Sequence, residues 1–478
     1  MSQSIVLIGT LLATLVIWKL VQTWRRPPFP PGPKGRYPFM GMTFDMPSKR
    51  PWETFGEWAN HQRRKSLPGT YRNAMVRRIF TNVLTAKKCD GYVPYQELES
   101  LATIHNILHE PKGYAHELHR YALSVARTVA FGKRVPTSSS EFATEMRDVM
   151  ENFSKAMTPG KYLFEAIPML RKLPSFAQPW LRELEKFKNL ELSFALKCYR
   201  DAVRQAELHP NRPCMAREVK AEMEKAQEDD EVQASSTCME ILGAGSETTA
   251  TALHFTILAL ATHPEVVEKA HEELDRVIGQ DRFPTWADEP NLPYIRAIIK
   301  ENQRWRSISP MSFPHYTSKD DVYNGYYIPK NCVVRVNHWM MHSNYERYSN
   351  PEKFDPERFI NHTQSAAASA NAVDASERDH FSYGGGKRIC PGIHLAERSL
   401  FMMTSRMLQT FKFGRPLDPK SGTPRELTAE DIGVSTSLIM TPGSDFDMSF
   451  EPRSKNIGQL LESEWLEKVA HQGESWMD

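Results

Sequence analysis

The sequence is poor in the features that define several large protein classes. It has only six cysteines in 478 residues, and they are scattered without paired spacing. This pattern argues against a disulfide framework and a zinc site, and it indicates a reducing compartment. The formal net charge is only +2, which argues against a nucleic-acid-binding surface. Internal repeats are absent as well.

Apolar residues are abundant enough for a large core. They make up 40% of the chain, and charged residues make up 25%, which predicts a folded protein. Periodic apolar positions favour helices over most of residues 51–230 and again over 232–263, 265–278 and 295–305. Short runs at 326–329 and 333–336 favour strands. The sequence therefore predicts a mainly helical fold with small β-sheets.

The most informative stretch is the glycine-rich loop 381–392, F-S-Y-G-G-G-K-R-I-C-P-G. Three consecutive glycines let the backbone approach a flat object closely. Lys387 and Arg388 precede Cys390, and an apolar-periodic run from Ile393 predicts a helix directly after it. The helix N-terminus and the two cations favour a thiolate, which is a nucleophile or a metal ligand. A buried, inert cysteine is the alternative that these residues leave open.

This loop resembles the haem-binding loop of the cytochrome P-450 superfamily. The family has Phe, Gly, Arg, Cys and Gly at fixed intervals, and this chain has Tyr383, Gly386, Arg388, Cys390 and Gly392. The resemblance implies that Cys390 is the axial thiolate ligand of haem iron, and that Tyr383, Gly386 and Arg388 help to bind the cofactor. Because C-x-x-C-H is absent, we expect haem b to be held without a covalent bond.

A second motif lies inside the apolar helix expected over 232–263. The stretch Ala244–Thr249 reads A-G-S-E-T-T. Gly243, Gly245 and the hydroxyl residues weaken the helix there, which indicates either close approach of a ligand or a core helix with a mild kink. The motif resembles the family's oxygen-activation motif. The resemblance implies that Thr248 hydrogen-bonds dioxygen or its water, and that Glu247 relays protons.

A third motif consists of Glu301 and Arg304, three residues apart on one helical face. Such a pair is most often an ordinary surface ion pair. The stretch 354–359, F-D-P-E-R-F, adds Arg358. The resemblance implies that these three residues form a buried structural triad that fixes the core around the haem loop.

The resemblance also assigns residues to the cofactor and substrate pocket. It implies that His315 binds a haem propionate, although a lone histidine is usually a satisfied structural group. Arg72, Arg77 and Arg78 are further propionate candidates, on a helix that lacks the family's usual Trp. The substrate-lining residues implied by the resemblance are apolar or small, which predicts an apolar or aromatic ligand; they are Ile241, Ala244, Ile308, Met311, Phe313 and Leu438.

The N-terminal stretch 5–21 is almost uniformly apolar and is followed by Arg25 and Arg26. It predicts an uncleaved membrane anchor rather than a signal peptide. Prolines between 27 and 33 predict a stiff hinge. We therefore expect an anchor at 1–26, a hinge and lead-in at 27–50, a haem-thiolate catalytic domain at 51–455 and a C-terminal extension at 456–478. Compared with the family, the N-terminal sheet region is expected to be shortened.

Four further segments carry local expectations. Residues 361–378 are rich in Ala and Ser and predict a flexible insertion. Residues 211–231 are charged and predict a solvated helix and loop. Residues 432–440 and 446–450 predict a terminal β-hairpin. The apolar spacing after residue 456 predicts an amphipathic helix.

Together the three motifs predict a haem-thiolate monooxygenase that inserts one oxygen atom from O2 into a small apolar or aromatic substrate. The chain looks most like microsomal fungal members of natural-product pathways. The resemblance implies electrons from NADPH through NADPH-cytochrome P-450 reductase, docked near Lys387 and Arg388. It also implies a single-pass endoplasmic reticulum protein whose catalytic domain faces the cytoplasm. Two alternatives remain: an oxidative-coupling or isomerase enzyme, and a shortened member that does not hold haem.

Overall fold

The computed structural model describes residues 74–156, 161–209, 214–225, 230–418, 420–426 and 448–470, together with 26–30 and a few isolated positions. The chain divides into two units. The described part of the smaller unit contains residues 26–30 and 313–336. The larger unit contains the described residues of 74–312 and 337–470. Each unit is considered by itself.

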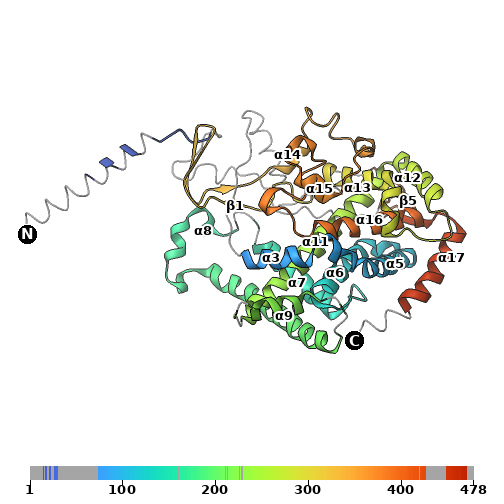
Figure 1. Cartoon of the computed structure of the whole chain (residues 1–478), viewed down its shortest axis with the longest axis horizontal. Coiled ribbons are helices and arrows are strands. Elements are labelled where there is room, and N and C mark those ends of the chain that lie inside the picture. The colour runs from blue at the N-terminus through green and yellow to red at the C-terminus, as the bar shows by residue number, and fades with distance from the viewer. Residues whose placement is uncertain are drawn as a thin grey trace, which may run out of the picture. The chain divides into compact units, whose positions relative to one another are not determined.

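The larger unit is built from helices, with one small sheet (Figure 1). In that sheet β5 (Phe411–Pro416) pairs antiparallel with β6 (Met448–Pro452). The helices are α3 (Ala74–Val83), α4 (Ala86–Asp90), α5 (Val93–His109), α6 (Tyr114–Phe131), α7 (Glu141–Ala156), α8 (Leu163–Ala166), α9 (Pro179–Leu208), α10 (Met215–Lys225), α11 (Glu231–Thr262), α12 (Pro264–Val277), α13 (Pro293–Trp305), α14 (His338–His342), α15 (Ala366–Asn371), α16 (Ile393–Thr410) and α17 (Lys455–Glu464).

The smaller unit holds two short antiparallel pairs. Strand β1 (His315–Tyr316) pairs with β4 (Val333–Val334), and β2 (Asp321–Tyr323) pairs with β3 (Tyr326–Ile328). The β2–β3 hairpin turns at Asn324 and Gly325, whose φ angles are 50° and 80°. This is the conformation for which Asn-Gly is preferred in two-residue hairpins. The predicted strands at 326–329 and 333–336 are thus confirmed, although the second is shorter than expected.

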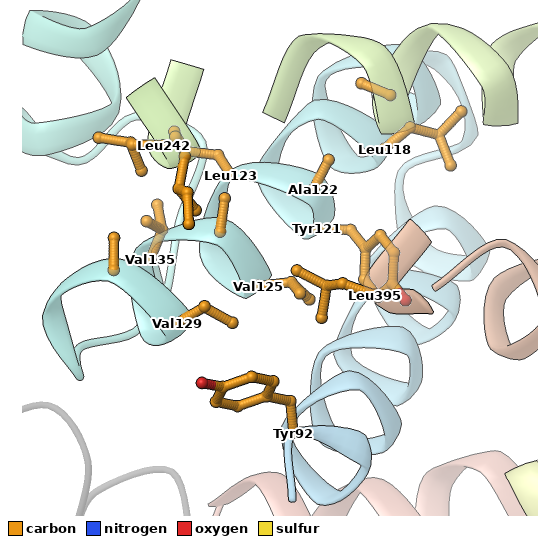
Figure 2. Close-up of a cluster of buried hydrophobic side chains, with 14 of the residues drawn as sticks. Tyr92, Leu118, Tyr121, Ala122, Leu123, Val125, Val129, Val135, Leu242 and Leu395 are labelled. Atoms are coloured by element: carbon orange, nitrogen blue, oxygen red, sulfur yellow. The ribbon is translucent and has the colours of Figure 1, made fainter. Parts of the chain in front are cut away.

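Helix α11 lies in the core of the larger unit and packs along α6, with α9, α10, α13 and α16 around it. Figure 2 shows side chains from α6, α11 and α16 meeting in this core, among them Tyr121, Leu242 and Leu395. A Cβ atom at Gly245 would lie 3.2 Å from the Cβ atom of Ala126 on α6. Gly245 therefore lets two helices approach closely. The helix is continuous through the motif, as the core-helix alternative expects, and the approach of a ligand to this motif stays a prediction.

Helix α16 is fixed to its neighbours by hydrogen bonds as well as by apolar packing. Gln96 Nε2 on α5 donates to Leu395 O at 3.1 Å and to Ser399 Oγ at 2.7 Å. The Tyr121 hydroxyl on α6 donates to Ser399 O at 3.1 Å. All four side chains are buried, so these bonds define the position of α16 relative to α5 and α6.

Two local expectations are wrong. Residues 361–378 are not a flexible insertion, because α15 lies within them, Ser365 caps it, and Ala367 and Ala370 are buried. Residues 215–225 are not a purely solvated helix, because α10 buries Met215, Val219 and Met223. The helices expected at 232–263 and 295–305 are confirmed as α11 and α13.

The C-terminal amphipathic helix is also confirmed. Ile457 and Leu461 of α17 are buried, and α17 packs against α5. The predicted terminal hairpin partly lies outside the described residues, since 427–447 are not described, and β6 pairs with β5.

Within the described part of the chain, no helix is long and apolar enough to cross a membrane. Most of the anchor predicted at 1–26 and of the hinge predicted at 27–50 lies outside the described residues. The region in which a shortened sheet is expected lies outside them as well.

Candidate functional site

The loop before α16 is closed by its own backbone. Cys390 N donates to Tyr383 O at 2.9 Å, and Ile389 N donates to Gly386 O at 3.1 Å. Gly384 and Gly386 have φ angles of 69° and 62°, which residues with a side chain adopt at a cost. The glycines thus allow the tight turn that places Cys390 three residues before the first residue of α16.

Three helices hold this loop from outside. Phe381 N donates to His342 Nε2 on α14 at 2.8 Å. The Ser382 hydroxyl donates to Gln303 O on α13 at 2.6 Å. Arg77 Nη2 on α3 donates to Ile389 O at 3.0 Å. The loop is therefore pre-formed by elements that are far apart in the sequence.

The electrostatics at Cys390 differ from the prediction. Burial raises the pKa of the Cys390 thiol, and the Gly392 N–H and the charge of Arg77 oppose this rise. The side chains of Lys387 and Arg388, which were expected to favour a thiolate, are exposed. The protein alone thus leaves the thiol protonated, whereas coordination to a metal ion would deprotonate it.

The second motif presents an accessible face on an otherwise buried helix. Ala244 is exposed and Thr248, one turn later, is half-buried, while Ile241 is buried. The Thr248 hydroxyl donates to Ala244 O at 2.6 Å. A hydroxyl on an accessible helical face can exchange this local bond for one to a ligand.

Glu247 faces a different neighbour. Its Oε1 atom lies 2.7 Å from His119 Nε2 on α6, and both side chains are partly buried. Consecutive residues on an α-helix point about 100° apart, so Glu247 is directed to α6 while Thr248 is on the accessible face. No pattern in the sequence points to His119, which lies 128 residues from its partner.

Glu301, Arg304 and Arg358 form one network. Arg304 donates to both carboxylate oxygens of Glu301, with both distances 2.7 Å, and Arg358 Nε lies 3.3 Å from Glu301 Oε1. Asp355 N donates to the same carboxylate at 2.9 Å. The side chains of Glu301 and Arg304 are 0% and 1% exposed, so this is not the ordinary surface pair that the motif alone suggested.

His342 connects this network to the cysteine loop. Its backbone oxygen accepts a hydrogen bond from Arg304 at 2.9 Å, and its ring accepts one from Phe381 N at 2.8 Å. Its Nδ1 atom is 3.1 Å from the Ser307 hydroxyl. Burial lowers the pKa of His342 well below its usual range, which keeps the ring neutral and able to accept. No motif in the sequence points to His342.

The other predicted site residues are distributed as follows. Met311 is buried and Ile308 partly buried in the larger unit. Phe313 and His315 belong to the smaller unit, so their part in the site stays a prediction. Arg78 pairs with Glu222 on α10 at 2.9 Å, whereas Arg77 donates to the loop at Ile389 O. Leu438 and Arg72 lie outside the described residues.

Comparisons with known proteins point to one family in each case. The family model described as Cytochrome P450 matches residues 68–440. Cytochrome P450 monooxygenase verL of Clonostachys rogersoniana is 33% identical, over 87% of this chain and 77% of that protein. Cytochrome P450 monooxygenase virE of Hypocrea virens is 31% identical, over 97% of this chain and 92% of that protein. Cytochrome P450 monooxygenase polD of Polytolypa hystricis is 36% identical, over 82% of this chain and 74% of that protein.

Among solved structures, a zebrafish cytochrome P450 determined with abiraterone has a TM-score of 0.60 and 24% identity, covering 79% of this chain and 81% of that one. At this identity the likeness supports the fold alone. The mainly helical fold with small sheets is confirmed as the cytochrome P450 fold. The chain belongs to the cytochrome P450 family, and it is an oxidoreductase of the monooxygenase type found in its fungal relatives.

Membership implies a haem group with a thiolate ligand, a small-molecule substrate and a redox partner that supplies electrons. The described residues fit such a group. A pre-formed loop carries Cys390 just before α16, and the charge of Arg77 beside it favours the thiolate form. Helix α11 adds the accessible face at Ala244 and Thr248.

Proposed function

We propose that this monooxygenase hydroxylates a small apolar or aromatic compound in fungal secondary metabolism, with Cys390 as the axial ligand of haem b. The observation that carries the proposal is the loop 381–392, which three helices hold in place with Cys390 before α16. The fungal monooxygenases among the relatives support the choice of pathway type.

The bound haem supplies the oxygen-activating iron chemistry. The chain's own residues hold the cofactor and handle protons. Arg77 holds the loop at Ile389 O and, with Tyr383, Gly386 and Arg388, would bind the haem. We also propose that His315 binds a haem propionate.

Proton supply is assigned to the motif on α11. The Thr248 hydroxyl, on the accessible face, would hydrogen-bond dioxygen or its water. Glu247, oriented by His119, would pass protons from the partly exposed side of α11 toward Thr248. A carboxylate held by a hydrogen bond keeps the geometry that proton transfer needs.

The substrate would meet an apolar surface. Ile241, Ala244, Ile308 and Met311 supply it from the larger unit, and Phe313 and Leu438 complete it in our proposal. None of these side chains carries a charge, which favours an apolar or aromatic compound over an ionic one.

Electrons would come from NADPH through NADPH-cytochrome P-450 reductase. Lys387 and Arg388 are exposed beside the cysteine loop and would form a basic docking surface. We keep the anchor at 1–26, the hinge at 27–50, the catalytic domain at 51–455 and the extension at 456–478 as proposals. Insertion into the endoplasmic reticulum membrane by a single span, with the catalytic domain in the cytoplasm, belongs to the same proposal.

The first test is the carbon monoxide difference spectrum of the reduced protein. We expect a long-wavelength Soret band that Cys390→Ala abolishes. Cys332→Ala, which removes another half-buried cysteine, is the matched control and should keep the band. A spectrum typical of a neutral ligand, or protein without haem, would instead favour the shortened family member that cannot hold the cofactor.

The same preparation tests the reaction type. With labelled dioxygen and a converted substrate, hydroxylation predicts one labelled oxygen atom in the product. A coupled or rearranged product without label would favour the oxidative-coupling or isomerase alternative.

The length of a relative bears on the shortened-member alternative. The alignment with virE covers 518 residues, more than this chain's 478. That relative therefore has residues without a counterpart here.

A further inference from the structure

A cluster of two histidines and a glutamate joins α5 to α17. His105 and His109 lie four residues apart on α5, and Glu462 lies on α17. His105 Nε2 is 3.2 Å from Glu462 Oε2, and His109 Nε2 is 2.8 Å from Glu462 Oε1. The ligand atoms of all three residues lie within 4.8 Å of one another. The cluster shares no residue with the cysteine loop or with the motif on α11.

The spacing of these atoms matches a metal site. Zinc binds imidazole nitrogen and carboxylate oxygen at about 2.0–2.2 Å in tetrahedral geometry, so its ligand atoms lie about 3.3 Å from one another. The two distances to Glu462, 2.8 and 3.2 Å, are close to this value. All the ligand atoms lie within 4.8 Å of one another, so an ion would draw the two imidazole nitrogens and one carboxylate oxygen together to about 3.3 Å. Histidines at positions i and i+4 are also the pair that one helical face presents to zinc.

The cluster is partly pre-organised. The His105 side chain is only 12% exposed, and its ring stacks on Trp465 with the centroids 4.2 Å apart and the planes 10° apart. Trp465 directly follows α17, so the packing that orients His105 comes from the same segment that brings Glu462. The His109 and Glu462 side chains are 56% and 44% exposed, which leaves an approach for an ion and a water ligand.

We propose that His105, His109 and Glu462 bind one divalent transition-metal ion, with zinc as the best match. A water molecule would occupy the fourth position, and the ion would fasten the C-terminal helix α17 to α5. Two neutral imidazoles and one carboxylate are a ligand set typical of zinc with an open position. The competing explanation is a pair of histidine–glutamate hydrogen bonds or ion pairs without metal.

The decisive experiment is equilibrium dialysis of the tag-free holoenzyme against zinc after treatment with a chelator, with metal content measured per haem. We expect one zinc ion per chain in the wild type, and at least a tenfold loss of affinity in both His109→Ala and Glu462→Gln. His116→Ala, which removes an exposed histidine from α6, is the matched control and should bind as the wild type does. The carbon monoxide spectrum verifies that each variant is folded.

A second measurement tests whether the ion fastens α17 to α5. Zinc should slow amide hydrogen exchange in residues 455–470 of the wild type and leave it unchanged in Glu462→Gln. Absence of stoichiometric zinc, or equal binding by the wild type and both cluster variants, would overturn the proposal in favour of ion pairs only. Loss of binding in His116→Ala to the same degree would overturn it as well, since it would indicate adventitious surface binding only.

Discussion

Replacing Arg304 by methionine should destabilise the protein far more than the same change at Arg358. Arg304 supplies two hydrogen bonds of 2.7 Å to Glu301, whose side chain is 0% exposed. Arg358 supplies only one contact to Glu301, at 3.3 Å, and its hydrogen bonds to Asn350 O and to the Ser349 hydroxyl are exposed to solvent. Leaving a buried charge without its main partner costs roughly 3–5 kcal/mol.

Three further contacts raise the expected loss. Arg304 also donates to His342 O at 2.9 Å, to Pro351 O at 2.7 Å and to Lys353 O at 3.2 Å, and each lost bond costs about 1 kcal/mol. We therefore expect Arg304→Met to lose at least about 5 kcal/mol of unfolding free energy. Arg358→Met should lose about 1–2 kcal/mol, since Glu301 keeps its bidentate partner.

The assay is urea unfolding followed by circular dichroism and by the haem spectrum in parallel. A double variant, Glu301→Gln with Arg304→Met, provides the internal control because it removes the unpaired charge. It should be at least about 1 kcal/mol more stable than Arg304→Met alone. Equal losses for Arg304→Met and Arg358→Met, or a double variant less stable than Arg304→Met, would refute the reasoning.

Three further predictions follow from other contacts. Gly245→Leu should destabilise the protein by about 1–3 kcal/mol in urea unfolding, because a Cβ atom at this position would lie only 3.2 Å from the Ala126 Cβ atom on α6. An unchanged urea midpoint would contradict the close packing of the two helices. Glu247→Gln should lower product formation about 100-fold. His119→Leu should lower it less, with a changed solvent isotope effect that His119→Gln restores; wild-type turnover in His119→Leu would exclude a positioning role. Burial lowers the pKa of His338 and of His380 to about 4, while the unfolded value is about 6.5. The unfolded state therefore binds more protons between these values, and each histidine should remove about 1.4 kcal/mol of stability per pH unit as the pH falls through this window. His338→Gln should flatten the slope of urea midpoints between pH 7 and 5, and an unchanged slope would contradict the assignment.

The sequence was sufficient where function depends on local spacing. The helices α11, α13 and α16 and the loop before Cys390 follow from periodicity and from motifs within single segments. It was insufficient for contacts between distant segments. Periodicity cannot tell which histidine meets Glu247, so His119 was missed, and the same holds for His342 beside the loop.

Composition was misleading at α15. A run of Ala and Ser was interpreted as flexible, although Ala is the strongest helix former and Ser365 is a good N-cap. In the structure its hydroxyl accepts from Ala368 N at 3.2 Å, and one face of the helix is buried. The order of the residues around the N-cap is therefore a better guide to structure here than the amino-acid composition of the segment.

The electrostatics at Cys390 show the same limit and bear on whether a shortened N-terminal region could hold haem. Sequence proximity pointed to Lys387 and Arg388, yet the cation that opposes the rise in the Cys390 pKa is Arg77, more than 300 residues away along the chain. The contacts described above that hold the loop all come from residue 77 onward, through α3, α13 and α14. A shorter segment before α3 therefore leaves these supports in place. Haem retention should depend on Arg77, because Arg77 is the N-terminal contribution to the loop that the described residues contain.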